Sequence, residues 1–270
     1  MANPATELFL PTHPGLPINL ADVYGTRRTA SGAENPTGMM TSFLAGHMFG
    51  MNTLAVLGGG IPYASGLWTV TTTGTGAAAA QATHPGGGVL LTAGSDSTFN
   101  TNLQSKAAWT PVADKWMLAH GRVQSSDITT VGWEFNIGAS AVDPATTNYT
   151  DVIGFKMAVG AGTVLAKVRG NAGTQVTSST LYTMTAATDA YFGFLFKLSA
   201  TTASNMGYFF YGADMLNLTA VLSVTDISGA QAQMAAMLTT PQTSYLNLHA
   251  KGSAGNPTVT FSAAMAQVQF

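Results

Sequence analysis

The sequence predicts an all-β protein whose strands form an antiparallel sandwich or barrel. After residue 60, apolar and polar residues alternate in short segments bounded by Gly, Asn, Asp and Pro. The segments recur at intervals of roughly 8 to 12 residues, which is typical of antiparallel strands and not of βαβ units. Before residue 60 this alternation is missing, and prolines dominate the first 38 residues. The chain therefore divides into an N-terminal attachment part and a β-sandwich.

The first 38 residues predict an extended arm. Their prolines, which exclude a long helix and disfavour a central strand, are Pro4, Pro11, Pro14, Pro17 and Pro36. The apolar residues of the arm have no local core and are expected to lie on another surface; they are Leu8, Phe9, Leu10, Leu16, Ile18 and Leu20. Residues 1–7 lack the basic and apolar regions of a secretory signal, which favours a protein made in the cytoplasm.

The stretch from Met39 to Leu57 is uncharged and rich in Met, Phe and Leu. Its apolar residues recur at steps of three and four, the spacing of one helical face, although Gly46 and Gly50 leave an irregular segment as the alternative. The residues expected to form an interface are Met40, Phe43, Leu44, Met48, Met51 and Leu54. Polar residues within the stretch argue against a membrane span. A glycine hinge then predicts a boundary between residues 1–60, for attachment, and 61–270, for the sandwich.

The strands of the sandwich follow from the period-two pattern. In the clearest case, Val131, Trp133, Phe135 and Ile137 share one face. The predicted strands span residues 67–73, 88–92, 116–124, 131–137, 152–159, 164–168, 174–184, 191–198, 206–211, 216–224, 245–250, 259–261 and 265–270. Aromatic residues on both faces of 208–211 predict a strand that is covered on both sides. High helix propensity predicts a helix over residues 228–238, lying across the end of a sheet.

The composition points to a subunit of an ordered assembly. Charged residues make up 8% of the chain, against about 25% in typical soluble domains, so little charge repulsion separates neighbouring copies. The net charge is −2 and basic residues are not clustered, which argues against nucleic-acid binding. With no cysteine, the chain has no disulfide framework, thiolate metal site or Cys nucleophile.

The motifs that carry enzymatic chemistry are weak or missing, so the sequence predicts no enzyme and no cofactor. Residues 74–79 read G-x-G-x-x-A, but no helix and no βαβ pattern follow, which favours a mobile loop between strands over a dinucleotide site. Glu134 has no second carboxylate on its strand face, and the sequence contains no G-x-S-x-G elbow. The loop residues that could bind Ca²⁺ are Asp96, Asp127, Asp143 and Asp151, although such residues more often bond their own turns. No metal site is therefore predicted.

Several strand and turn motifs, in their order along the chain, resemble the jelly-roll proteins of tailed-phage virions. The motifs are Gly-Gly-Val-Leu-Leu-Thr at 87–92, Arg-Val-Gln-Ser-Ser-Asp at 122–127, Asp-Val-Ile-Gly-Phe-Lys-Met at 151–157, Tyr-Phe-Gly-Phe at 191–194 and the ending 258–270. The resemblance covers about residues 65 to 270. It implies a concanavalin- or laminin-G-like jelly-roll sandwich and a role in decorating capsids, and it transfers no catalytic residue.

These observations lead to one hypothesis and two alternatives. The hypothesis is a non-enzymatic capsid cement or decoration protein on the virion surface, which binds the major capsid protein and neighbouring copies of itself, as a homotrimer, and which binds neither nucleic acid nor membrane. The first alternative is a carbohydrate-binding adhesin or tail-associated domain. The second is a shell protein that assembles by itself.

Overall fold

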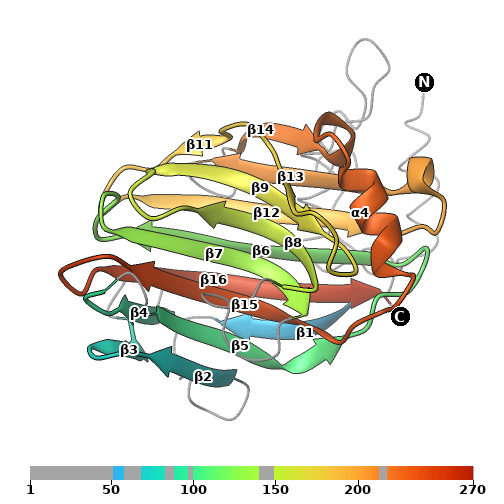
Figure 1. Cartoon of the computed structure of the whole chain (residues 1–270). Helices are drawn as coiled ribbons and strands as arrows, with labels where there is room; N and C mark the ends of the chain where they lie inside the picture. Colours follow the sequence, from blue (N-terminus) through green and yellow to red (C-terminus); the bar gives the residue numbers. More distant parts are fainter. Residues whose placement is uncertain are drawn as a thin grey trace, which may run out of the picture. The chain divides into compact units, whose positions relative to one another are not determined.

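The fold is a sandwich of two antiparallel β-sheets (Figure 1). The computed structural model describes residues 51–57, 68–82, 88–96, 100–139, 149–212 and 218–269. Residues Thr53–Val268 form a compact unit that contains nearly all residues of the two sheets. Within the described residues, no helix is long and apolar enough to cross a membrane.

The first sheet has eight strands. In spatial order these are β14 (Leu218–Ser223), β13 (Met206–Gly212), β12 (Asp189–Lys197), β6 (Trp116–Ser125), β16 (Thr258–Gln269), β4 (Val89–Ala93) and β3 (Ala77–Gln81), with β1 (Met51–Leu57) also pairing with β16. The long strands β6 and β12 lie at its centre and pair over their whole length, from Asp189 opposite Gln124 to Lys197 opposite Trp116.

The second sheet also has eight strands. In order these are β10 (Val176–Thr177), β9 (Thr163–Arg169), β8 (Asp151–Met157), β7 (Val131–Ala139), β15 (Ser244–Gly252), β5 (Asn100–Trp109) and β2 (Trp68–Thr73), with β11 (Tyr182–Thr183) also pairing with β9.

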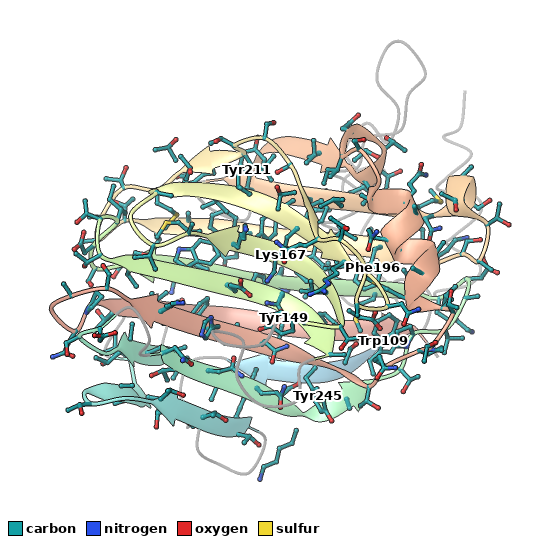
Figure 2. The ribbon with its side chains drawn as sticks, in the orientation of Figure 1. Trp109, Tyr149, Lys167, Phe196, Tyr211 and Tyr245 are labelled. Atoms are coloured by element: carbon teal, nitrogen blue, oxygen red, sulfur yellow. The ribbon has the colours of Figure 1, made fainter. Side chains whose placement is uncertain are left out.

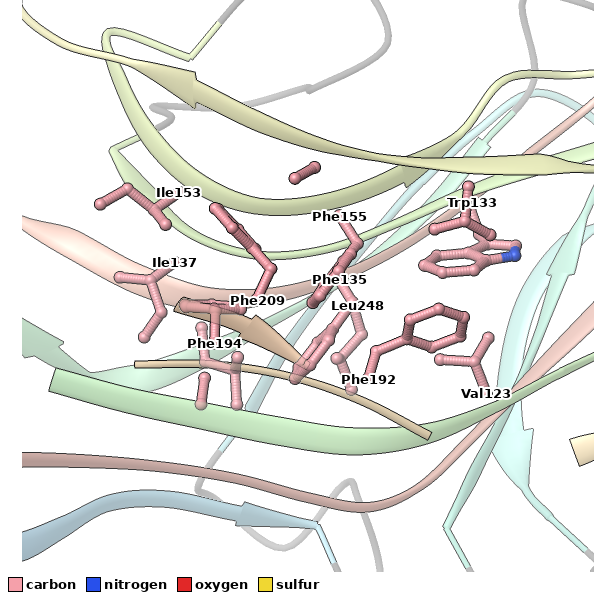
Figure 3. Packing of buried hydrophobic residues seen from close by; sticks show 14 of the residues in the cluster. Val123, Trp133, Phe135, Ile137, Ile153, Phe155, Phe192, Phe194, Phe209 and Leu248 are labelled. Carbon is pink, nitrogen blue, oxygen red and sulfur yellow. The ribbon is translucent and has the colours of Figure 1, made fainter. Parts of the chain in front are cut away.

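The core lies between the sheets and is rich in aromatic rings (Figure 3). Trp133 of β7 packs on Phe192 of β12, with ring centroids 5.2 Å apart, and on Phe261 of β16 at 6.3 Å. Phe155 of β8 packs on Phe192 at 5.2 Å and on Phe209 at 5.4 Å. Each of these rings is at most 1% exposed. The alternation along residues 131–137 therefore identified the core face correctly.

The predicted helix is confirmed as α4 (Ala230–Met237). It follows Gly229, whose φ of 81° is a left-handed conformation that glycine adopts without strain. Ala230, Met234 and Met237 are buried and belong to the core cluster. The helix contacts β9 and the short helix η2 (Thr202–Ser204), so it closes one end of the sandwich.

Most predicted strands are confirmed, strand β5 was not predicted, and four further differences stand out. The ending forms one strand, β16, instead of two, because a register shift against β6 between Ser262 and Met265 absorbs the break in alternation. Residues 174–184 contain only the two-residue strands β10 and β11. Residues 77–81, predicted as part of a mobile loop, form strand β3, because a run of alanines carries no period-two signal.

The fourth difference concerns the stretch with helical spacing. Residues Met51–Leu57 form strand β1, so a helix does not extend through Met51 and Leu54. Thr53 and Val56 are β-branched, and pairing with β16 supplies the backbone hydrogen bonds that a helix would otherwise make internally. β1 precedes the predicted boundary at residue 60 and is nevertheless part of the first sheet.

Candidate functional site

The residues predicted from the sequence to form an interface can be located only in part. Leu8, Phe9, Leu10, Leu16, Ile18, Leu20, Met40, Phe43, Leu44 and Met48 lie outside the described residues. Met51 and Leu54 lie in β1 at the first sheet. The surfaces that the structure does describe are the outer faces of the two sheets, and these differ sharply in chemistry.

The outer face of the second sheet is built from polar side chains. Because directly opposite residues share a face, the strand register aligns them in two rows across the sheet. The first row is Thr69, Gln104, Asn247, Asn136, Gly154 and Lys167, and the second is Thr71, Asn102, His249, Glu134, Lys156 and Leu165. We refer to these two rows as the polar face. Its central members Asn136, Asn247 and His249 are at most 3% exposed.

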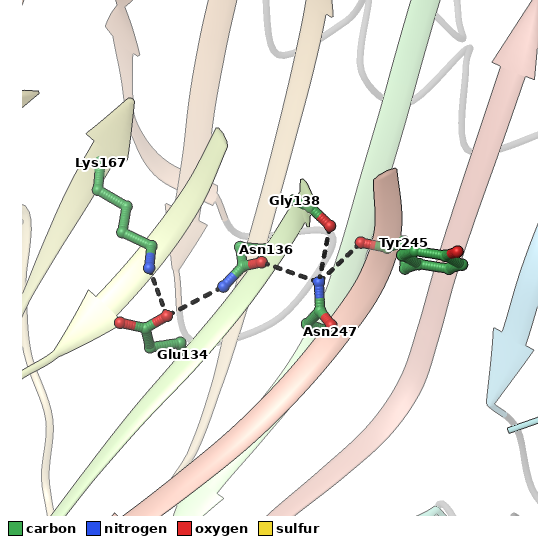
Figure 4. A network of polar contacts seen from close by, with 6 residues as sticks. All are labelled: Glu134, Asn136, Gly138, Lys167, Tyr245 and Asn247. Carbon is green, nitrogen blue, oxygen red and sulfur yellow. Dashed lines mark hydrogen bonds and ion pairs between the residues drawn. The ribbon is translucent and has the colours of Figure 1, made fainter. Parts of the chain in front are cut away.

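A charged pair anchors one side of the polar face (Figure 4). Lys167 is 1% exposed and its Nζ forms an ion pair and hydrogen bond with Oε2 of Glu134. The aromatic ring of Tyr149 lies 4.6 Å from the same Nζ, a cation–π contact that also excludes water (Figure 2). Burial lowers the pKa of Lys167, and the charge of Glu134 opposes this shift. The ammonium group is therefore held by one carboxylate and one ring.

Amide groups extend this pair into a network. Asn136 donates to Glu134 Oε2 over 3.1 Å, and its own Oδ1 accepts from Asn247 over 3.3 Å. Asn247 also donates to the carbonyl of Tyr245 at 2.9 Å and accepts at Oδ1 from Gln104 over 3.0 Å. The chain of contacts thus runs from β9 across β7 and β15 to β5. A satisfied buried network of this kind makes the sheet rigid and holds each side chain in one orientation.

Gly154 of β8 makes the charged pair geometrically possible. It lies between Lys167 and Asn136 in its row, so the side chain of Lys167 crosses β8 above this glycine to reach Glu134. A Cβ atom at position 154 would come within 2.3 Å of the carbonyl oxygen of Phe135 and 2.5 Å of the Cβ of Asn136. No larger residue fits without a shift of the β7 backbone.

The other side of the polar face contains polar atoms without a partner. Asn100, on the same face of β5, is 0% exposed, and neither side-chain atom of its amide makes a hydrogen bond. The Oδ1 atom of Asn102 also lacks a partner, and this residue is 4% exposed and lies opposite His249. Buried amides without partners are costly, so each of these groups calls for a hydrogen-bonding partner. This part of the polar face is the candidate ligand site.

The outer face of the first sheet is apolar at its centre. Leu118, Leu195 and Phe210 point away from the core, since their strand neighbours Ala119, Phe194 and Phe209 point into it. All three are 0% exposed although they do not belong to the core cluster. We refer to these three residues as the apolar face. The two-sided burial predicted for residues 208–211 is thus confirmed by Phe209 and Phe210.

His120 lies beside the apolar face and is held neutral. It is 6% exposed, and its two ring nitrogens make no hydrogen bond. Burial lowers its pKa from 6.5 to about 4. Below pH 6.5 the unfolded chain therefore binds a proton that the folded chain does not bind, so folding stability falls as the pH is lowered towards 4.

We expect this histidine to cost about 2 kcal/mol of folding stability at pH 5 relative to pH 8. Urea unfolding of the wild type and of His120→Leu at both pH values measures it. Because all other titrating groups are shared, the difference between the two pH profiles isolates His120. Parallel profiles for the two proteins would contradict the buried, neutral state.

The carboxylates considered as Ca²⁺ ligands are engaged locally or are apart. Asp127 accepts hydrogen bonds from Thr129 N at 2.7 Å and from the hydroxyls of Thr129 and Thr130, and these bonds lower its pKa to about 2. Asp151 is buried, which raises its pKa, and it accepts from Asn171 N at 2.6 Å. Asp143 lies outside the described residues. Among the residues that are described, no three His, Asp or Glu side chains come together as metal ligands.

A surface depression near the end of β9 is lined by Arg169, Ala172, Gly173, Thr174 and Gln175. The guanidinium of Arg169 already donates to the carbonyl of Gly173 at 2.6 Å and to that of Ala172 at 2.9 Å. The cation therefore shapes this loop and is committed to its backbone.

The polar face was not predicted from the sequence. Glu134 was considered only for a second carboxylate on its strand face, whereas it pairs with Lys167 from two strands away. A lysine between apolar neighbours in a predicted strand was the one available signal, because a charge at such a position needs a partner.

Comparisons with known proteins bear on the fold. No protein-family model and no curated protein matches the sequence. Among solved structures, the globular domain of T. cruzi calreticulin is similar with a TM-score of 0.55 and 10% identity, covering 80% of this chain and 88% of that one. The carbohydrate recognition domain of Emp47p gives a TM-score of 0.48 at 9% identity, with coverage of 80% and 93%. The CBM2 module of the evolved Dit of Lactobacillus casei BL23 phage J-1 gives 0.46 at 8% identity, with coverage of 82% and 97%. The likeness to the calreticulin domain agrees with the fold, a sandwich of two antiparallel β-sheets.

Proposed function

We propose that this chain is a non-enzymatic structural protein of a phage virion, a cement or decoration subunit that binds the major capsid protein. In this proposal the arm at Leu8–Leu20 and the apolar segment Met39–Leu57 attach the subunit to the capsid surface and to neighbouring copies, as a homotrimer. The protein is made in the host cytoplasm and stabilises the phage head. Many weak contacts repeated over a lattice add through avidity, so no single site has to be strong.

The observation that carries the proposal is the low content of charged residues, 8% of the chain, which lets copies and capsid subunits pack closely with little charge repulsion. Leu118, Leu195 and Phe210 point away from the core but are completely buried within the chain itself, so they offer no free surface to a partner.

Deletion of residues 1–38 tests the attachment role. We expect the truncated protein to keep the circular dichroism of a β-sandwich and to lose binding to purified capsids in a sedimentation assay. The full-length protein is the control in the same assay. Capsid binding that survives the deletion would refute attachment through the arm, and closed shells formed by the full-length protein alone would favour a shell protein instead.

A second candidate function, glycan binding, is favoured by the unpartnered amides of the polar face. Asn100 and Asn102 are buried beside His249, and sugar hydroxyls can both donate to and accept from such amides. The ring of Tyr149 lies at the other side of the same face, where it contacts Lys167. The ligand would be a neutral glycan, bound by hydrogen bonds and not by ion pairing.

A glycan array with and without Ca²⁺ tests this candidate. We expect glycan binding that does not depend on Ca²⁺. Asn102→Ala should weaken this binding, and the distant Thr177→Ala should leave it unchanged. If the folded protein binds no glycan on the array, the glycan-binding hypothesis is refuted. The proposed decoration role would not be affected.

A further inference from the structure

One edge of the sandwich is formed by strands β2 and β3. Each is the last strand of its sheet, and the turn Gly74–Thr75–Gly76 joins them (Figure 1). Within the described part of the chain, no further strand pairs with the outer side of either one. An edge strand presents backbone N–H and C=O groups that can pair with another strand.

The chemistry of this edge leaves it open to pairing. Four of the five residues Thr69–Thr73 are threonine and the fifth is Val70, all with high β propensity. The sequence has no Asp, Glu, Lys or Arg between Glu34 and Asp96, and no proline interrupts Trp68–Gln81. Soluble proteins usually protect an edge strand with lysine, proline, a bulge or a very short strand. β2 has none of these devices.

The side chain of Val70 is exposed on the inner side of β2, where no neighbouring strand of the described residues covers it. It lies opposite Leu103, which is completely buried in the core, so the side chain of Val70 points to the inner side of the sheet. It is nevertheless 39% exposed, because the sheet ends at β2. One further strand beside β2 would cover Val70 and extend the core by one row.

The opposite edge of the same sheet is protected. There the sheet ends in β10 and β11, each only two residues long, both paired with β9. Short edge strands offer few backbone groups to a partner. Of the two edges of this sheet, the β10 and β11 edge is therefore protected and the β2 edge is not.

We propose that β2 is a self-association edge, which pairs antiparallel with β2 of a second copy and joins the two second sheets into one continuous sheet. A two-fold contact places each residue against an identical strand, so any charge on it would meet a like charge. β2 carries no charge, and threonine opposite threonine forms favourable cross-strand pairs. The edge is thus complementary to itself. This contact lies outside residues 1–57 and holds whether or not the subunit decorates capsids.

A two-fold antiparallel pair of β2 strands fixes which residues lie opposite each other. Residues opposite each other in an antiparallel pair point to the same face, so in a two-fold pair of identical strands one residue must lie opposite its own copy. The Cα atoms of such a pair are about 4.5–5.5 Å apart, within the range that a disulfide spans.

Lysine substitution tests the edge in the full-length protein. Thr72 is exposed and shares the side of Val70, so Thr72→Lys should keep the fold and place one ammonium group of each copy in the contact. We expect sedimentation velocity over a concentration series to show a pairwise association of the wild type, distinct from any trimer formed through the N-terminal residues, weakened about ten-fold or more by this substitution. Thr177→Lys, on the protected edge, is the matched control and should behave as the wild type.

Cysteine substitution tests the register, since the chain has no cysteine of its own. Single Cys variants at 69, 70, 71 and 72 are oxidised mildly and analysed by non-reducing electrophoresis. One position should give a strong covalent dimer and its neighbours little, whereas Thr177→Cys should give none. The proposal is overturned if no position cross-links, if Thr72→Lys leaves the association unchanged, or if the edge cross-links only to capsid protein in assembled particles.

Discussion

Replacing Glu134 by Gln is expected to lower the free energy of unfolding by about 3–5 kcal/mol, the range seen when one partner of a buried ion pair is removed. Lys167 is 1% exposed, and Glu134 is the carboxylate that faces its Nζ. Without this charge the ammonium group either stays buried and uncompensated or loses its proton. Both outcomes destabilise the fold, because burial already lowers the pKa of Lys167.

The double variant Glu134→Gln/Lys167→Met should recover most of that loss, since removing both charges leaves no buried ion. Urea unfolding of the two variants and the wild type gives the comparison. Asp114→Asn is the matched control: its partner Lys197 is 3.8 Å away and its side chain is 75% exposed, so a change within about 0.5 kcal/mol is expected. A Glu134→Gln protein as stable as this control would show that the polar face does not depend on its charged pair.

Replacing Phe194 by Ala is expected to cost about 3–5 kcal/mol, the usual loss for a fully buried phenylalanine. The ring is 1% exposed, and its centroid lies 5.8 Å from that of Phe135, 6.1 Å from Phe155 and 6.2 Å from Phe209. These contacts join the central strands of both sheets. The cavity left by alanine would therefore lie at the middle of the core, where relaxation is least able to fill it.

Equilibrium unfolding in urea measures this loss. Phe194→Leu keeps most of the volume and should lose less than half as much as Phe194→Ala. Val112→Ala, at a side chain that is 49% exposed, is the surface control and should stay within about 0.5 kcal/mol of the wild type. Equal losses for the Ala and Leu variants would mean that the ring contacts, and not the filled volume, account for the stability.

The parts of the fold that follow from the sequence are those in which one face of a strand is apolar. Trp133, Phe135 and Ile137 alternate with polar residues, so the core side of β7 can be read directly. β5 gives no such signal, because its inward residues include Thr101 and Ser105. Their hydroxyls bond backbone groups inside the sandwich: Thr101 donates to the carbonyl of Thr92 over 2.6 Å, and Ser105 accepts from Leu246 N over 3.0 Å. In the sequence pattern, such inward-facing polar residues look the same as residues on a solvent-exposed strand face.

The candidate site could not be read from the sequence for a different reason. Glu134 and Lys167 are 33 positions apart, and only the order β7, β8, β9 brings them together. Strand order in an antiparallel sheet follows from long-range packing, which a local pattern of residues does not contain. The helix α4 is the opposite case, since its local propensity and its stop at Pro241 were sufficient to place it.

Gly154 also limits how this surface can change among related sequences. Because the side chain of Lys167 crosses β8 above Gly154 to reach Glu134, we expect these three positions to covary. A homologue that gains a side chain at 154 has to shift the β7 backbone next to Glu134, and we expect such a shift to disturb the pair of Glu134 and Lys167. We expect the three positions to be exchanged together among relatives of this chain. Lineages that keep the glycine should be those whose outer sheet has remained polar.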